Sequence, residues 1–197
     1  MKQNEIFDAN LYSHYVRDFI IPESLIQELL SFAQKNDSNF SPAKIYISED
    51  RRGLLDATRT CMHFHYKLSH GAPDVSPHLK ELAQELFIEW PENLRFGQYE
   101  IIKYQNIGDQ FLRHRDDDAY GSGHNRHLTS VTLLDKSTDL IGCDLKLWSF
   151  YEDQKSIATI NLEIGETVIF PAYYPHEATT LLCGSRTVLI SWAEKIS

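Results

Sequence analysis

The second half of the sequence contains a series of short apolar or alternating segments, and this pattern limits the possible fold more than any other feature. Turn-forming residues separate the segments from residue 94 onward, including Gly108, Gly121, Gly165 and Gly184. Short segments of this kind, bounded by Gly, Asn, Asp or Ser, are typical of β-strands. Six or more strands at this spacing predict a β-sandwich or barrel. The predicted strands are 99–104, 128–134, 144–150, 157–162, 167–170 and 186–192.

The first half of the sequence predicts two helices that pack against this β-structure. Apolar residues recur there at i, i+3, i+4 and i+7, which is the spacing of one helical face. One helix is expected from Pro22-Glu23 to about Lys35, and another over 76–90. No repeat or low-complexity tract interrupts the chain. We therefore expect one domain of the α+β class, mainly β, over 1–197, with helical support in 1–95 and the β core in 96–197.

The charge balance and the cysteine content limit the classes of partner and the compartment. With 19 Lys and Arg against 28 Asp and Glu, the formal net charge is −9, which disfavours binding to nucleic-acid phosphates. Three cysteines without a CxxC motif indicate neither a disulfide framework nor a zinc knuckle. The N-terminus lacks a signal-peptide pattern, and no apolar run approaches the roughly 18 residues of a membrane span. We expect a cytoplasmic protein that binds neither nucleic acid nor membrane.

The chemistry of the chain is expected to depend on His114, Asp116 and His176. In an extended segment, residues i and i+2 lie on the same face, so His114 and Asp116 can present an imidazole and a carboxylate to one point. An HxD pair alone is a common chance pattern. A turn at 183–185 would bring Arg186 near the position that His176 faces. Two histidines and one carboxylate match the facial triad of non-haem iron enzymes, and arginine suits a carboxylate-bearing co-substrate.

Together these motifs resemble those of the Fe(II)- and 2-oxoglutarate-dependent dioxygenases, particularly the prolyl 4-hydroxylase-like branch. The resemblance covers roughly residues 97–193 and includes YQNIGDQFLRHRD at 104–116, RHLTSVTLLD at 126–135, GCDLKLW at 142–148 and the run at 164–192. It implies a double-stranded β-helix, or jelly-roll, core supported by N-terminal helices. Where the family has a pair of glycines, this chain has Gly142-Cys143.

The resemblance also implies a reaction and roles for individual residues. The implied reaction is hydroxylation of a C–H bond with conversion of 2-oxoglutarate to succinate. The implied cofactors are Fe(II), 2-oxoglutarate and O2, with ascorbate as an optional reductant. The matching positions are His114, Asp116 and His176 for the iron ligands, Arg186 for the residue that binds the distal carboxylate of 2-oxoglutarate, Tyr104 and Thr132 for further contacts with the co-substrate, and Trp192 for a tryptophan that closes the pocket.

The sequence leaves the substrate open. The resemblance favours a prolyl residue in a protein or peptide, with a free amino acid or small metabolite as the alternative. A non-catalytic sensing module on the same scaffold is a further alternative. A nucleic-acid demethylase is disfavoured, because residues 187–197 contain no second arginine. The oligomeric state is also left open.

Several other polar residues have two interpretations each. His63 and His65 form an HxH pair that can bind metal, but structural or surface roles are favoured over a role in the substrate pocket. Asp117 and Asp118 belong to an acidic run, for which a solvated loop is favoured over selection of a cationic substrate. Surface positions are expected for three arginines of a polar stretch, Arg51, Arg52 and Arg59.

Overall fold

The computed structural model describes residues 15–43, 59–86, 91–117, 125–149 and 156–195. Its helices are α1 (Glu23–Lys35) and α2 (Ser76–Ala83), with short 3-10 turns η2 (Asp37–Asn39), η3 (Leu68–His70) and η4 (Gln84–Leu86). Its strands are β1 (Val16–Phe19), β2 (Ser41–Pro42), β3 (Met62–Tyr66), β4 (Leu94–Tyr104), β5 (Phe111–His114), β6 (Arg126–Lys136), β7 (Ile141–Gly142), β8 (Leu145–Trp148), β9 (Ser156–Ile160), β10 (Glu166–Pro171), β11 (His176–Ala178), β12 (Leu181–Cys183) and β13 (Arg186–Lys195).

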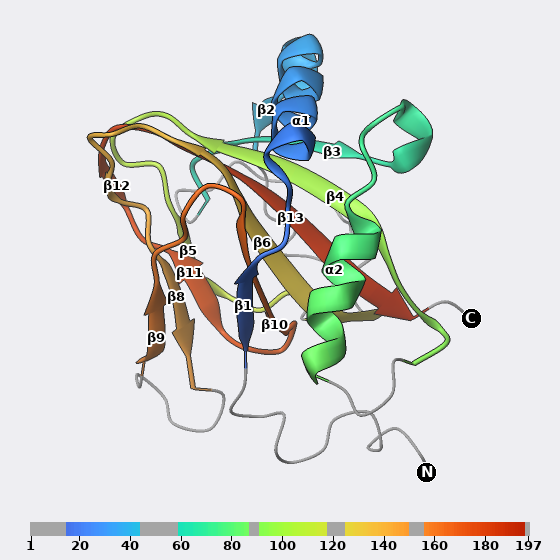
Figure 1. The fold of residues 1–197 in the computed structure, drawn as a ribbon. Coiled ribbons are helices and arrows are strands. Elements are labelled where there is room, and N and C mark those ends of the chain that lie inside the picture. The colour runs from blue at the N-terminus through green and yellow to red at the C-terminus, as the bar shows by residue number, and fades with distance from the viewer. Residues whose placement is uncertain (1–14, 44–58, 87–90, 118–124, 150–155, 196–197) are drawn as a thin grey trace, which may run out of the picture.

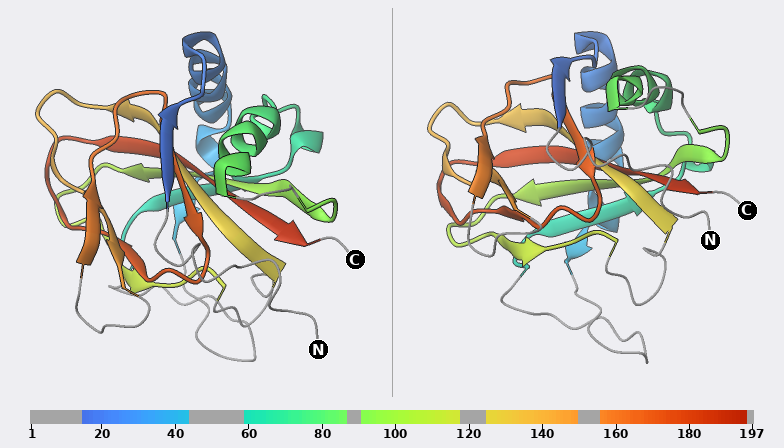
Figure 2. Two further views of the ribbon diagram at one scale, coloured as in Figure 1. Left: turned by 60° about the horizontal axis from the view of Figure 1, so that its bottom comes forward. Right: turned by 90° about the horizontal axis from the view of Figure 1, so that it is seen from below.

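The strands form two main antiparallel sheets. Within the described ranges, the larger sheet has seven strands in the order β1-β10-β6-β13-β4-β3-β2, and the smaller sheet has four in the order β5-β11-β8-β9. A separate pair joins β12 to β7. Helices α1 and α2 lie on one face of the larger sheet, and the smaller sheet lies on the other (Figures 1 and 2). The two facing sheets confirm the predicted jelly-roll core of a mainly β protein.

Both faces of the larger sheet are buried, in different cores. On β6, Leu128 and Leu134 pack into the core below the helices, whereas Val131 and Leu133 pack into the core between the two sheets. Successive side chains of a strand point to opposite faces, so a strand that is buried on both faces has a nearly continuous apolar sequence. This explains the long apolar runs of β4, β6 and β13. Along each strand, residues at alternate positions enter alternate cores, so the position of a residue in this alternation decides which core its side chain enters.

The six predicted strands and the first predicted helix are confirmed, with shifted boundaries. α1 ends at Lys35 as predicted, and β4, β6 and β13 are longer than the segments that predicted them. The predicted helix over 76–90 is shorter, because α2 ends at Ala83 and continues as η4, while 87–90 lie outside the described residues. No helix in the described ranges is both long and apolar enough to cross a membrane.

The turn between β7 and β8 needs its single glycine. Gly142 and Cys143 both have positive φ angles, of 80° and 56°. A Cβ atom on Gly142 would lie 2.1 Å from the backbone oxygen of Thr180, so no other residue fits without a shift of the backbone. Cys143 adopts the left-handed conformation itself, and its carbonyl accepts a hydrogen bond from Nη1 of Arg186. One glycine is therefore sufficient for this turn in the place of the family's two.

We expect Gly142→Ala to lower the free energy of unfolding by more than about 1 kcal/mol, because the substitution adds both strain and a clash with backbone. Gly97→Ala is the matched control, since a Cβ atom on Gly97 meets no atom within 4 Å. Urea denaturation of both variants and of the wild type measures the difference. Equal stabilities of the two variants would contradict the requirement for glycine at 142.

Candidate metal centre

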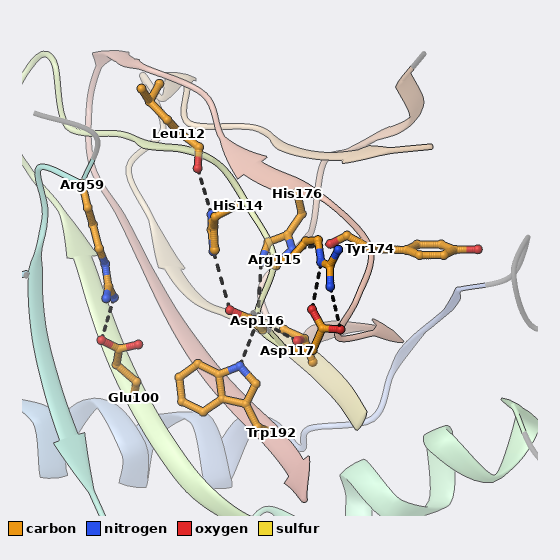
Figure 3. Close-up of polar contacts among 11 residues, drawn as sticks. Arg59, Glu100, Leu112, His114, Arg115, Asp116, Asp117, Tyr174, His176 and Trp192 are labelled. Atoms are coloured by element: carbon orange, nitrogen blue, oxygen red, sulfur yellow. Dashed lines mark hydrogen bonds and ion pairs between the residues drawn. The ribbon is translucent and has the colours of Figure 1, made fainter. Parts of the chain in front are cut away.

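Three of the predicted site residues lie together at one end of the space between the two sheets. β5 and β11 pair so that His114 and His176 are directly opposite each other, which places their side chains on the same face. Nε2 of His114 lies 3.6 Å from Oδ1 of Asp116, and Nε2 of His176 lies 3.4 Å from Oδ2. The ligand atoms of the three residues all lie within 4.8 Å of one another (Figure 3). This is the spacing of a group that can hold one metal ion.

Backbone carbonyls orient both imidazole rings. Nδ1 of His114 lies 2.8 Å from the carbonyl oxygen of Leu112, and Nδ1 of His176 lies 2.9 Å from that of Tyr174. A carbonyl only accepts hydrogen bonds, so each neutral ring carries its hydrogen on Nδ1. The lone pair of each ring is then on Nε2, the atom that faces Asp116. Metal-binding histidines have the same arrangement, in which one nitrogen donates to the protein and the other binds the ion.

Two side chains of the larger sheet hold the carboxylate of Asp116. Oγ1 of Thr129, on β6, donates to Oδ2 at 2.6 Å, and Nε1 of Trp192, on β13, donates to the same oxygen at 2.9 Å. The backbone nitrogen of Asp116 also donates to the carbonyl oxygen of Ala172 at 3.0 Å. The carboxylate is therefore fixed from the larger sheet, while the two histidines come from the smaller one.

The protonation states of the three residues suit a metal site. Burial alone would raise the pKa of Asp116, but His176 and His114 beside it hold that pKa well below its usual range. Burial and the neighbouring His114 lower the pKa of His176 to about 4, against the opposing effect of Asp116. Near neutral pH the group therefore offers an ionised carboxylate and, at His176, an imidazole with a free lone pair.

Arg186 and Tyr104 lie side by side, farther along the interior. They are direct neighbours in the register of β13 and β4, and both side chains are buried. Burial raises the pKa of Tyr104 well above its usual value, so its hydroxyl remains a hydrogen-bond donor. Residues 186, 188, 190 and 192 share one face of β13. The side chain of Arg186 therefore faces the space between the two sheets, as that of Trp192 does.

Thr132 does not lie in this space, which corrects the role expected for it. It shares the helix-side face of β6 with Leu128 and Leu134, and its hydroxyl pairs with that of Thr167 at 2.7 Å. The residue of β6 that does face the site is Thr129. The contact that Thr129 makes is with Asp116 and is not the co-substrate contact expected of Thr132. A hydroxyl in an apolar strand was the signal for either threonine.

A second polar cluster is formed by residues of β3 and β4 together with Arg59, which precedes β3. The sequence did not predict its members as a group. Glu100 is only 2% exposed, and its Oε1 accepts from Nη2 of Arg59 at 2.6 Å and from Nδ1 of His63. Nε2 of His65 lies 3.3 Å from the same oxygen. The surface position expected for Arg59 is wrong, because its side chain is 9% exposed. A charged residue within an apolar strand, as Glu100 is, was the signal that could have revealed the cluster.

The remaining residues singled out in the sequence are less informative. Asp117 forms an ion pair with Arg115, at 2.9 Å and 3.0 Å, beside the metal-binding group. Arg51, Arg52 and Asp118 lie outside the described residues.

Comparisons with known proteins agree with this geometry. No protein-family model matches the chain. A PKHD-type hydroxylase of Prochlorococcus marinus is 24% identical over 182 residues, which cover 90% of this chain and 78% of the relative. A Trichoplax adhaerens prolyl hydroxylase, solved in complex with a peptide fragment of the hypoxia inducible factor oxygen degradation domain, superposes with a TM-score of 0.68 at 16% identity, covering 93% of this chain and 84% of that one.

A third similar protein is an oxidoreductase of the 2OG-Fe(II) oxygenase family from Burkholderia pseudomallei. Its crystal structure superposes with a TM-score of 0.61 at 11% identity, covering 100% of this chain and 95% of that one. The jelly-roll fold is shared by this chain and both solved structures. These similarities agree with the resemblance found in the sequence: the chain has the fold of prolyl 4-hydroxylase-like 2-oxoglutarate and Fe(II) oxygenases.

Proposed function

We propose that this protein is an Fe(II)- and 2-oxoglutarate-dependent dioxygenase that hydroxylates an unactivated C–H bond. The observation that carries the proposal is the convergence of His114, Asp116 and His176 with their ligand atoms within 4.8 Å. The similarity to a PKHD-type hydroxylase supports the same reaction class. A sensing module without catalysis would not need a complete set of ligands, so the enzyme is the favoured interpretation.

The residues of the site fit the proposed cofactors. Two imidazoles and one carboxylate form the facial triad that binds non-haem Fe(II) with open positions. The bound iron would supply the O2 chemistry that side chains cannot perform. Arg186 would neutralise the distal carboxylate of 2-oxoglutarate with a fork of donors, and the protonated hydroxyl of Tyr104 would donate to the same co-substrate. Thr129 and Trp192 would keep Asp116 in its position as a ligand. Ascorbate would serve as an optional reductant.

The proposed substrate is a prolyl residue in a protein or peptide. The support is the fold shared with a prolyl hydroxylase that was solved with a bound peptide. A free amino acid or small metabolite is the alternative, since one fold serves many substrates. A mass-spectrometric screen of prolyl peptides, free amino acids and metabolites for the gain of one oxygen atom distinguishes these classes.

Purified protein supplied with Fe(II), 2-oxoglutarate and O2 should form succinate, and Asp116→Ala should abolish this turnover. The variant loses the carboxylate ligand, so its affinity for Fe(II) should also fall. Asp117→Ala is the matched control, because that neighbouring carboxylate pairs with Arg115 instead. Succinate formation by Asp116→Ala at the wild-type rate would refute the assignment of Asp116 as a ligand. Absence of succinate with the wild-type protein would refute the proposed enzymatic activity.

Thr129→Val should weaken metal binding about 10- to 100-fold, the usual effect of removing a residue that orients a ligand. Thr132→Val, on the same strand but on the opposite face, is the control and should leave metal affinity unchanged. Titration of both variants with Co(II), followed by its visible absorption, measures the two affinities. Equal losses of metal affinity in the two variants would contradict the role assigned to Thr129.

Arg186→Ala should raise the 2-oxoglutarate concentration needed for half-maximal succinate formation, roughly 10- to 100-fold, because a hydrogen-bonded charge pair is lost. Arg186→Lys keeps the charge but not the fork of donors and should have an intermediate effect. An unchanged dependence on 2-oxoglutarate in the alanine variant would exclude Arg186 as the carboxylate-binding residue.

A further inference from the structure

The proposed reaction does not use the polar cluster formed by Arg59, His63, His65 and Glu100, which we call the Glu100 cluster. Three of its residues come from the paired strands β3 and β4: His65 is directly opposite Glu100, and His63 is two residues away on the same strand. Arg59 precedes β3 and forms an isolated bridge with Phe111. Glu100, Ile102 and Tyr104 alternate along β4, so all three face the space between the two sheets. Ile102 and Tyr104 belong to the core between the sheets, which confirms the direction of this face.

The Glu100 cluster lies at the level of the candidate metal centre. Glu100 precedes Tyr104 by four residues, roughly 13 Å along an extended strand, and it pairs with Ile190, between Arg186 and Trp192. The cluster therefore lies beyond the expected position of the 2-oxoglutarate carboxylate, on the β3–β4 side of the space. Figure 3 shows Arg59 and Glu100 beside the group that converges on Asp116.

Aromatic rings connect the Glu100 cluster to two of the candidate ligands. The guanidinium of Arg59 lies 4.6 Å from the ring centre of Phe111, which stacks on His114 at 3.5 Å. The ring of His65 lies 6.4 Å from that of Trp192, whose Nε1 donates to Asp116. The cluster is thus connected to the metal centre through two aromatic side chains, Phe111 and Trp192.

The ionised carboxylate of Glu100 fixes the hydrogen positions of both histidines. Burial opposes ionisation, but Arg59 and His63 hold the pKa of Glu100 well below its usual value, so the carboxylate only accepts hydrogen bonds. Nδ1 of His63 is in hydrogen-bonding contact with this carboxylate and donates to it. Nε2 of His65 lies 3.3 Å from the same oxygen, which favours a hydrogen on that nitrogen. When the rings are neutral, the opposite nitrogens, Nε2 of His63 and Nδ1 of His65, are acceptors that point away from Glu100.

The charges of the cluster favour a neutral partner. Arg59 already compensates Glu100 at 2.6 Å, so the pair offers no net charge to an ion. The same contact disfavours a second metal ion at His63, His65 and Glu100, since the guanidinium shares the oxygen that both rings face. Partial burial lowers the pKa of His65 against the opposing effect of Glu100, which favours the neutral ring. With both rings neutral, the cluster has acceptor nitrogens and no uncompensated charge.

We propose that the Glu100 cluster is a substrate subsite in which the outward nitrogens of His63 and His65 accept hydrogen bonds from a neutral donor, an amide N–H or a hydroxyl, of the molecule whose C–H bond is hydroxylated. That the bound molecule is a substrate rests on the proposed function, whereas the expected hydrogen positions on His63 and His65 are independent of it. In a peptide substrate the donor would be the backbone amide of the residue after the proline, because the prolyl residue itself has no N–H.

The hydrogen positions can be measured without any turnover. In ¹⁵N-histidine-labelled full-length protein at mildly alkaline pH, long-range ¹H–¹⁵N spectra distinguish protonated from unprotonated ring nitrogens. We expect His63 to carry its hydrogen on Nδ1 and His65 on Nε2, with assignments from His63→Phe and His65→Phe. Glu100→Gln should abolish this selection, because an amide both donates and accepts. His78→Gln, on α2, is the control that should change neither ring.

Two small amides of similar size test the acceptor. N-methylacetamide has an N–H donor, whereas N,N-dimethylacetamide has none. Only the former should shift the resonance of the unprotonated Nδ1 of His65 upfield, and Glu100→Gln should lose the shift. Hydrogen on Nδ1 of His65 or on Nε2 of His63, doubly protonated rings, equal shifts with both amides, or no shift with either would overturn the proposal.

The spectra are recorded with Zn(II) and 2-oxoglutarate added, as a diamagnetic form of the complex, and again without them. If the wild type forms no succinate but shows the expected hydrogen positions and shift, the proposed function fails and the donor-binding cluster stands. If it forms succinate but the hydrogens or shifts differ, the subsite fails and the enzyme stands.

Discussion

The arrangement of the whole site depends on one buried carboxylate. Asp116 is held by Thr129 and Trp192 from the larger sheet, while the histidines on either side of it belong to the smaller sheet. A buried charge without partners is costly, so the two sheets must approach each other in the one alignment that supplies all of its contacts. The jelly-roll packing and the metal-binding geometry are therefore two results of the same requirement.

The sequence predicted the elements from local spacing, and it predicted the metal-binding group from the HxD motif together with the family resemblance that added the distant His176. A period of two revealed the strands, and the HxD motif already placed two side chains on one face. Thr132 shows where such reasoning ends. A strand that is buried on both faces has no polar side to define its orientation, so the alternation alone does not say which residues enter which core.

The Glu100 cluster was missed for a different reason. Arg59 and Glu100 are 41 residues apart in the chain and meet through long-range pairing, in which Arg59 forms a bridge with Phe111 and the following strand β3 pairs with β4. Considered alone, an arginine in a polar stretch is expected at the surface, and a glutamate in a strand is expected at an edge. The ion pair between Arg59 and Glu100 compensates the cost of burying either charge. No property of one residue by itself reveals the other. Long-range pairing of this kind is information that the strand pattern does not contain.

The parity of β13 also limits which changes in length this chain can accept. Arg186 and Trp192 lie six positions apart on a strand that pairs on both sides, with β4 and with β6. An insertion or deletion of one residue between them would turn one of the two side chains toward the helices, and the register with both neighbours would shift as well. In related sequences, changes in chain length should therefore be found in the connections outside this strand, while the interval from 186 to 192 keeps a constant length.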